Sequence, residues 1–245
     1  MPAKTSRICF TGFFLLTVHA IAAMGQLTPS QAGYIDAVAD FGADSTGGSV
    51  TTGELQSAIN AATSQHKPLY IPPGTYLIDN TLVVEDGATD SREQNTFIAG
   101  SSADPRRRTV IVLQSGTFTN QSFRRQVILY KKWDGYTNTF HGVIQNIDIV
   151  IEENNAGAIG LRWRGAEGCG IFDVHIDARG GFAGLEMLPG SGGSAANISI
   201  TGGQYGIWLP SGSTQPTPTI TGVTLRNQSQ AAICSVSQLH SPVTR

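Results

Sequence analysis

Two groups of residues in the second half of the chain have side chains suited to chemistry on a sugar polymer. Asp148, His175 and Asp177 form the first group. Two carboxylates around a histidine can supply a general acid and a general base to a glycosidic bond, which needs carboxyl groups roughly 5 to 9.5 Å apart. The alternative interpretation of these residues is an ordinary set of polar side chains on an exposed strand face.

Arg162, Glu186 and Trp208 form the second group. An outward tryptophan beside an Arg–Glu pair can form a sugar platform, because an aromatic face offers rigid apolar area at a low entropy cost. We therefore assign Arg162 and Trp208 to substrate binding, and we add Glu186 to the candidate catalytic carboxylates. The alternative is a cross-strand ion pair next to a tryptophan that a loop covers.

A repeat of roughly 24 residues must position both groups. Its segments alternate apolar and polar residues, which is typical of strands, and two strands per repeat predict one coil of a parallel β-solenoid. The first series comprises 146–150, 173–177, 197–201 and 222–226, and the second comprises 159–163, 183–187, 205–209 and 231–235.

Stacked coils place equivalent residues in ladders whose rungs lie about 4.8 Å apart. Ile147, Val174 and their equivalents are predicted to point inward. Asn146, Asp173 and Asn197, which begin successive repeats, are predicted to stack as a turn ladder. Three outward ladders follow: Asp148, His175, Ser199, Thr224; Val150, Asp177, Thr201, Arg226; and Arg162, Glu186, Trp208, Cys234.

The N-terminal part predicts a cap for the solenoid. A helix is expected from Thr51 to Ser64, with Thr51 and Glu54 as a capping box and an apolar stripe of Leu55, Ala58, Ile59 and Ala62. Such a helix can cover the apolar end of the first coil.

Three segments in the N-terminal part of the chain resemble a known family. The segments Asp40–Asp44, Leu55–Ile59 and Leu69–Tyr76 are similar to the start of the pectate-lyase-superfamily domain. That domain occurs in glycoside hydrolase family 55 exo-β-1,3-glucanases, in rhamnogalacturonase- and epimerase-like proteins, and in some phage tailspikes. The resemblance covers about Ala37 to Val236. It implies an all-β fold: a right-handed, single-stranded parallel β-helix with an N-terminal capping helix.

The predicted organisation is a signal peptide at 1–25, a flexible leader at 26–36, the β-helix domain at 37–236 and a tail at 237–245. Lys4 and Arg7 precede an apolar run, and small residues then predict cleavage near Ala22 or Gly25. We therefore expect a secreted, periplasmic or cell-surface protein without a stable membrane anchor.

The net charge, the cysteine spacing and the distribution of acidic residues limit the ligands and covalent bonds that we expect for this chain. The net charge is −2, which leaves no basic surplus for nucleic acid. Cys169 and Cys234 are nearly three coils apart, roughly 13 Å at about 4.8 Å per coil, so no disulfide is expected. No Asp-rich run offers a Ca²⁺ site, and we expect neither a metal nor a cofactor. The Arg106–Arg108 run is either a contact for an acidic polymer or a solvated loop.

The combined expectation is an exported carbohydrate-active protein that acts on a polysaccharide or oligosaccharide as a glycoside hydrolase or lyase-like β-helix. The alternative is a non-catalytic glycan-binding, adhesive or structural surface module, and a tailspike-like protein is the third reading. The strand around Ile233 is expected to leave an open edge. Through this C-terminal coil the chain is expected to oligomerise, aggregate when isolated, or continue into further coils.

Overall fold

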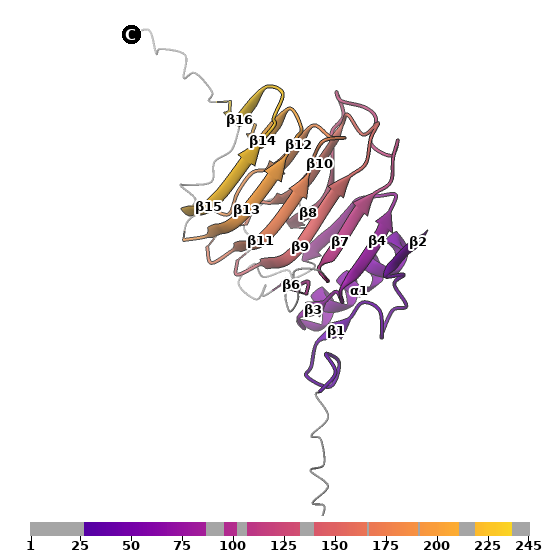
Figure 1. Ribbon diagram of the computed structural model, residues 1–245. Helices are drawn as coiled ribbons and strands as arrows, with labels where there is room; N and C mark the ends of the chain where they lie inside the picture. Colours follow the sequence, from indigo (N-terminus) through magenta and orange to yellow (C-terminus); the bar gives the residue numbers. More distant parts are fainter. Residues whose placement is uncertain are drawn as a thin grey trace, which may run out of the picture.

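The described residues fold as a parallel β-helix with a helix at its N-terminal end (Figure 1). The computed structural model describes residues 27–86, 96–101, 107–132, 140–165, 167–190, 192–210 and 219–236. Coil follows coil from the indigo N-terminal end to the yellow C-terminal end, with neighbouring strands side by side. Every strand pair of the described part is parallel, as the repeat predicts.

The strands form two sheets. The larger sheet pairs, in order, β1 (Ile35–Asp36), β3 (Leu69–Tyr70), β6 (Phe97–Ala99), β9 (Val143–Ile151), β11 (Gly170–Asp177), β13 (Ser194–Thr201) and β15 (Thr219–Arg226). A branch of it contains β2 (Thr46–Val50), β4 (Gly74–Ile78) and β7 (Thr109–Leu113), and joins at β9. The smaller sheet pairs β5 (Leu82–Asp86), β8 (Arg125–Lys132), β10 (Ala158–Trp163), β12 (Ala183–Glu186), β14 (Tyr205–Leu209) and β16 (Ala231–Ser235).

A ladder of left-handed residues divides each long strand of the larger sheet in two. Asn146, Asp173, Asn197 and Gly222 have φ angles between 51° and 61°. Asn, Asp and Gly tolerate this conformation better than other residues. β6 pairs with the part of β9 before Asn146, and β7 pairs with the part after it. The predicted stacking of these residues is confirmed, but they lie inside the strands and not in turns before them.

The predicted register is also confirmed. Ile147 pairs with Val174, Val174 pairs with Ile198, and all three are buried. The glycines of the second series explain how the sheets approach each other. An added Cβ at Gly160 would lie 2.7 Å from Ile176, and one at Gly184 would lie 2.3 Å from Ile200. Side chains from the larger sheet therefore fill the space over these glycines.

The helix α1 (Thr52–Gln65) packs against β5, β1 and β3 at the N-terminal end. Its buried residues are the predicted stripe of Leu55, Ala58, Ile59 and Ala62. The predicted capping box is wrong, because the Thr51 side chain makes no cap bond to the helix backbone. Thr51 Oγ1 instead donates to Glu54 Oε2 and accepts a bond from the Asp44 amide, which ties the helix start to the preceding turn.

The coil stack begins earlier than predicted, and its last coil is more exposed than the coil before it. The first strand, β1, lies within the segment predicted as a flexible leader and pairs with β3. At the other end, Ile233 is 55% exposed, whereas its ladder neighbour Ile207 is 1% exposed.

Cys169 and Cys234 form no disulfide, as predicted. No helix in the described residues is long and apolar enough to span a membrane.

Replacing Val174 by Asp should remove at least about 3 kcal/mol of stability, because an unpaired carboxylate would face the core. His175→Ala, one residue along and on the outer face, should cost at most about 1 kcal/mol. Thermal or urea unfolding measures both. Equal losses would mean that the register is off by one residue.

The isolated chain should self-associate through its C-terminal coil, because Ile220, Ile233 and Val236 leave apolar surface at the end of the stack. Light scattering should show a mass that rises with protein concentration, and Ile233→Lys should reduce that rise. A monomer that is stable at every concentration would contradict this expectation.

Candidate functional site

Three shallow depressions lie next to one another on the outer face of the larger sheet, and together we call them the groove. The first lies over β4, β7 and β9, the second over β9, β11 and β13, and the third over the ends of β7, β9 and β11. Asp148 belongs to the first and second depressions, and Val150, Asp177 and Arg179 belong to the second and third. Since neighbouring strands lie about 4.8 Å apart, the five strands span roughly 19 Å. The first predicted group, Asp148, His175 and Asp177, lines the middle depression.

Arg108 connects the charged residues at one side of this groove. Its Nε donates to Asp148 Oδ1 at 2.8 Å, its Nη1 donates to Asp173 Oδ2 at 2.8 Å, and its Nη2 donates to the Asp173 carbonyl at 3.0 Å. Burial by itself lowers the pKa of Arg108, but the hydrogen bonds to Asp173 and Asp148 outweigh it and raise the pKa. The guanidinium therefore stays charged and holds two strands' carboxylates in place.

His175 lies between the same two carboxylates. Its Nδ1 is 3.3 Å from Asp148 Oδ1, and its Nε2 is 3.6 Å from Asp173 Oδ1. Asp173 Oδ1 also accepts a hydrogen bond of 2.7 Å from Asn197 Nδ2, the next rung of the turn ladder. Asp148, Asp173 and His175 thus form one network on the outer face.

Asp177 is a diagonal neighbour of Asp148. Asp148 pairs with His175 on the adjacent strand, and Asp177 follows two residues later. Their Cα atoms are therefore roughly 8 Å apart, from a strand spacing of about 4.8 Å and a rise of about 3.3 Å per residue. The Arg179 side chain hydrogen-bonds Asp177 and lowers the pKa of its carboxyl group. Asp177 therefore stays ionised at neutral pH.

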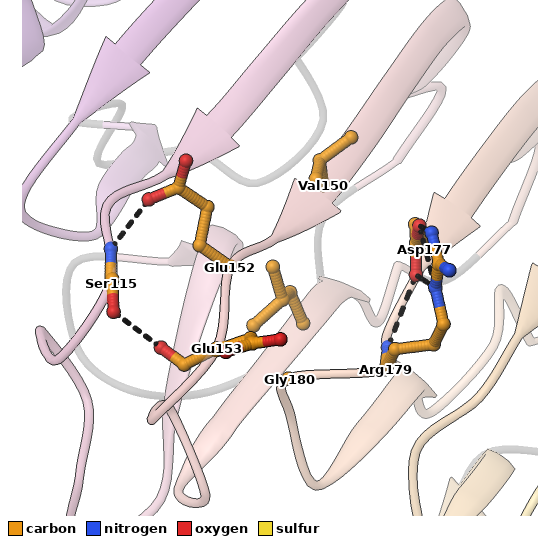
Figure 2. A pocket seen from close by; sticks show the side chains of 8 residues that line it. Ser115, Val150, Glu152, Glu153, Asp177, Arg179 and Gly180 are labelled. Carbon is orange, nitrogen blue, oxygen red and sulfur yellow. Dashed lines mark hydrogen bonds and ion pairs between the residues drawn. The ribbon is translucent and has the colours of Figure 1, made fainter.

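The third depression lies where β7, β9 and β11 run into their turns, and it contains two more carboxylates (Figure 2). The Ser115 amide donates to Glu152 Oε2 at 2.8 Å, and Ser115 Oγ donates to the carbonyl of Glu153 at 2.8 Å. Gly180 lies against this turn so closely that an added Cβ would be 2.0 Å from the Glu152 carbonyl oxygen. The turn after β11 can pass here only as glycine.

The second predicted group lies on the outer face of the smaller sheet. Arg162 pairs with Glu186, and Glu186 with Trp208, as the ladder predicts. Glu186 is only 5% exposed, and it accepts hydrogen bonds from Gln126 and Arg162.

Trp208 does not stand alone as a platform. The Arg124 guanidinium lies 4.4 Å from the ring centroids of both Phe182 and Trp208, and the edge contact of Phe182 with Trp208 has a centroid separation of 5.1 Å. This geometry fits the alternative of a cross-strand ion pair beside a covered tryptophan. The role of these residues in sugar binding stays a prediction.

The structure adds Asp173, Arg179, Glu152 and Glu153 to the predicted site residues, and it places Arg108 of the predicted arginine run against Asp148 and Asp173 and not in a solvated loop. Asp173 could have been found from the sequence, because it lies two residues before His175 on the same strand. Arg108 could not, because its place depends on how β7 aligns with β9 across forty residues. In the described part of the chain, no group of three His, Cys, Asp or Glu side chains could hold a metal ion.

Residues 36–238 match the model of the rhamnogalacturonase A/epimerase, pectate lyase-like family. The chain belongs to this family. The matched range includes the segments Asp40–Asp44 and Leu69–Tyr76, on which the resemblance in the sequence rests.

Curated relatives of the chain are much longer than it. It is 26% identical over 151 residues to the non-secreted LysM effector LysM15 of Penicillium expansum, covering 58% of this chain and 10% of that protein. It is 25% identical over 192 residues to LysM19 of the same fungus, also named a non-secreted LysM effector, covering 70% and 14%. The chain thus spans a small part of these relatives.

Among solved structures, the chain is similar to the ORF18 protein of Geobacillus virus E2. The TM-score is 0.54 at 14% sequence identity, and the match covers 80% of this chain and 43% of the viral chain. This likeness shows the fold alone.

Arg108→Met should destabilise the protein by about 2–3 kcal/mol, because Asp148 and Asp173 would lose their shared cation while half-buried. Arg179→Met is the matched control: its side chain is 75% exposed and pairs with Asp177 at the surface, so its loss should cost clearly less stability than the loss of Arg108. Urea unfolding compares the two variants. An equal or smaller loss for Arg108→Met would show that the Arg108 network does not hold the strands.

Proposed function

We propose that the chain is a carbohydrate-active β-helix that holds a polysaccharide in the groove across β4, β7, β9, β11 and β13. The observation that carries the proposal is that three depressions with shared lining residues lie next to one another over five strands. A groove of this kind suits an extended polymer better than a single small molecule. Membership of a pectate lyase-like family supports the same class of ligand.

The lining of the groove suits sugar hydroxyls. Asp148, Asp177 and Glu152 offer carboxylate oxygens that accept hydrogen bonds from hydroxyl groups, and Arg179 offers donors. Val150 lies at the junction of two depressions and offers an apolar contact for the C–H face of a ring. The groove thus offers polar contacts for the hydroxyl groups of a pyranose ring and an apolar contact for its C–H face.

Hydrolysis of the bound glycan is the second candidate function, and the placement of Asp148 and Asp177 favours it. Their backbone separation of roughly 8 Å is compatible with the carboxyl spacing of an inverting glycosidase, about 6.5 to 9.5 Å. Asp177 stays ionised at neutral pH, so it is the carboxylate that can accept a proton from the attacking water. The proton donor would then be Asp148 or His175, which contact each other.

Export to the cell surface or medium is part of the proposal. The apolar run after Lys4 and Arg7 supports it, although residues 1–26 lie outside the described residues. The two fungal relatives are named non-secreted, so N-terminal sequencing of protein recovered from culture medium decides the question for this chain.

Native electrophoresis in gels containing soluble polysaccharides tests the groove. The panel is a β-glucan, xylan, galactomannan and polygalacturonate, and at least one polymer should retard the wild-type protein. Val150→Trp should abolish the retardation, because the new ring fills the junction of two depressions from the outer face of β9.

Trp208→Ala is the matched control, because it alters the other candidate face and should leave the retardation intact. Loss of retardation in Trp208→Ala but not in Val150→Trp would move the binding site to the smaller sheet. Reducing-end release by the wild type, absent in Asp177→Asn, would support the hydrolytic candidate.

A further inference from the structure

The charges along the groove point to the class of glycan. The lining of its three depressions contains more carboxylates than cations. The carboxylates are Asp148, Asp177, Glu152 and Glu153, and the cations are Arg107, Arg108 and Arg179. Asp173, bound to Arg108 just beside the lining, adds a further negative charge.

Arg108 has little capacity left for an acidic ligand. Three of its nitrogens already donate to Asp148 and Asp173, and its side chain is 13% exposed. A carboxylate on the ligand would have to displace one of these partners. The displaced aspartate would then lie unpaired next to another negative charge, which is costly in a half-buried position.

Arg179 is engaged in the same way at the middle of the groove. Its Nε donates to both carboxylate oxygens of Asp177, at 2.9 and 3.1 Å, and its Nη2 pairs with the same carboxylate. The fork therefore already holds the planar anion for which a guanidinium is best suited. Outward donors of Arg179 remain for hydroxyl groups.

Glu152 and Glu153 line the third depression. Among the described residues of that lining, Arg179 is the one cation. The carboxylate of Glu152 accepts a hydrogen bond from the Ser115 amide, which is a neutral donor (Figure 2). A polyanion bound over the third depression would face these like charges, whose repulsion extends over roughly a Debye length, 8 to 10 Å at ordinary salt.

From this charge pattern we infer that the groove selects glycans without acidic groups and disfavours polyuronates. The inference rests on the proposed function, because it concerns the ligand of the same groove. A preference for neutral glycans differs from the substrate that the family description pectate lyase-like suggests, because pectate carries a carboxylate on nearly every sugar. Hydroxyl groups can instead donate to the groove carboxylates without disturbing their arginine partners.

The test compares a neutral glucan or xylan with polygalacturonate of matched length, each titrated into the wild-type protein and followed by calorimetry at 20 and at 200 mM NaCl. The neutral polymer should bind at least tenfold more tightly at low salt. Added salt should weaken the discrimination, because it screens the repulsion between the polyuronate and the groove.

Glu153→Gln supplies a variant that keeps the backbone contact of Ser115 to the Glu153 carbonyl. It should narrow the affinity gap between polygalacturonate and the neutral polymer by roughly threefold, because the amide removes the like charge while its oxygen can still accept a hydrogen bond from a hydroxyl group. Glu54→Gln, on the exposed first turn of α1, removes one charge far from the groove and should change neither affinity.

The outcomes separate this inference from the proposed function. Polygalacturonate binding as tight as or tighter than the neutral polymer, blocked by Val150→Trp, would overturn the inference and leave the proposed groove standing. Binding of neither class would overturn both. An equal effect of Glu153→Gln and Glu54→Gln would show that discrimination comes from net charge and not from the groove, and would also overturn the inference.

Discussion

Parallel pairing between successive coils is the constraint on which the structure depends. A strand can pair with the next coil only if equivalent residues point the same way, so each position of the repeat becomes a ladder about 4.8 Å per rung. Inside, the ladder of Ile147, Val174 and Ile198 forms a continuous apolar core. Outside, the same pairing places Asp148 next to His175. Core and candidate site are two sides of one register.

A ladder of left-handed residues interrupts this register. Asn146, Asp173 and Asn197 each have a positive φ angle inside a long strand, and at Asn146 the pairing of β9 changes from β6 to β7. Asp173 also uses its side chain twice, accepting from Arg108 and from Asn197. A residue required by backbone geometry thus takes part in the charged network of the groove. This double role explains why its carboxylate lies so close to His175.

Much of the fold could be predicted from the sequence because the signals are local and repeated. The alternation around Ile147 and Val174 defined the inner face, and the stripe of α1 defined its buried side. The capping box failed because Thr51 is bound by the Asp44 amide, a contact that a local motif does not reveal.

The site was only partly predictable. The ladder of Asp148 and His175 followed from the repeat, whereas Arg108 reaches it through β7, which precedes the regular repeats and whose alignment with β9 is set by tertiary pairing. For Trp208, the sequence predicted the outward direction but not the approach of Arg124 and Phe182, which come from other segments. Long-range packing decides such contacts, and no local pattern encodes it.

Carboxyl footprinting tests the central claim that the groove holds a glycan most directly. The protein is labelled with a carbodiimide and an amine, with and without the polysaccharide that retards it most strongly, and labelled sites are quantified by mass spectrometry. The account predicts that the glycan protects Asp177, Glu152 and Glu153 while labelling of Glu54 on α1 is unchanged. Unchanged labelling of the groove carboxylates in the presence of a bound glycan would contradict it.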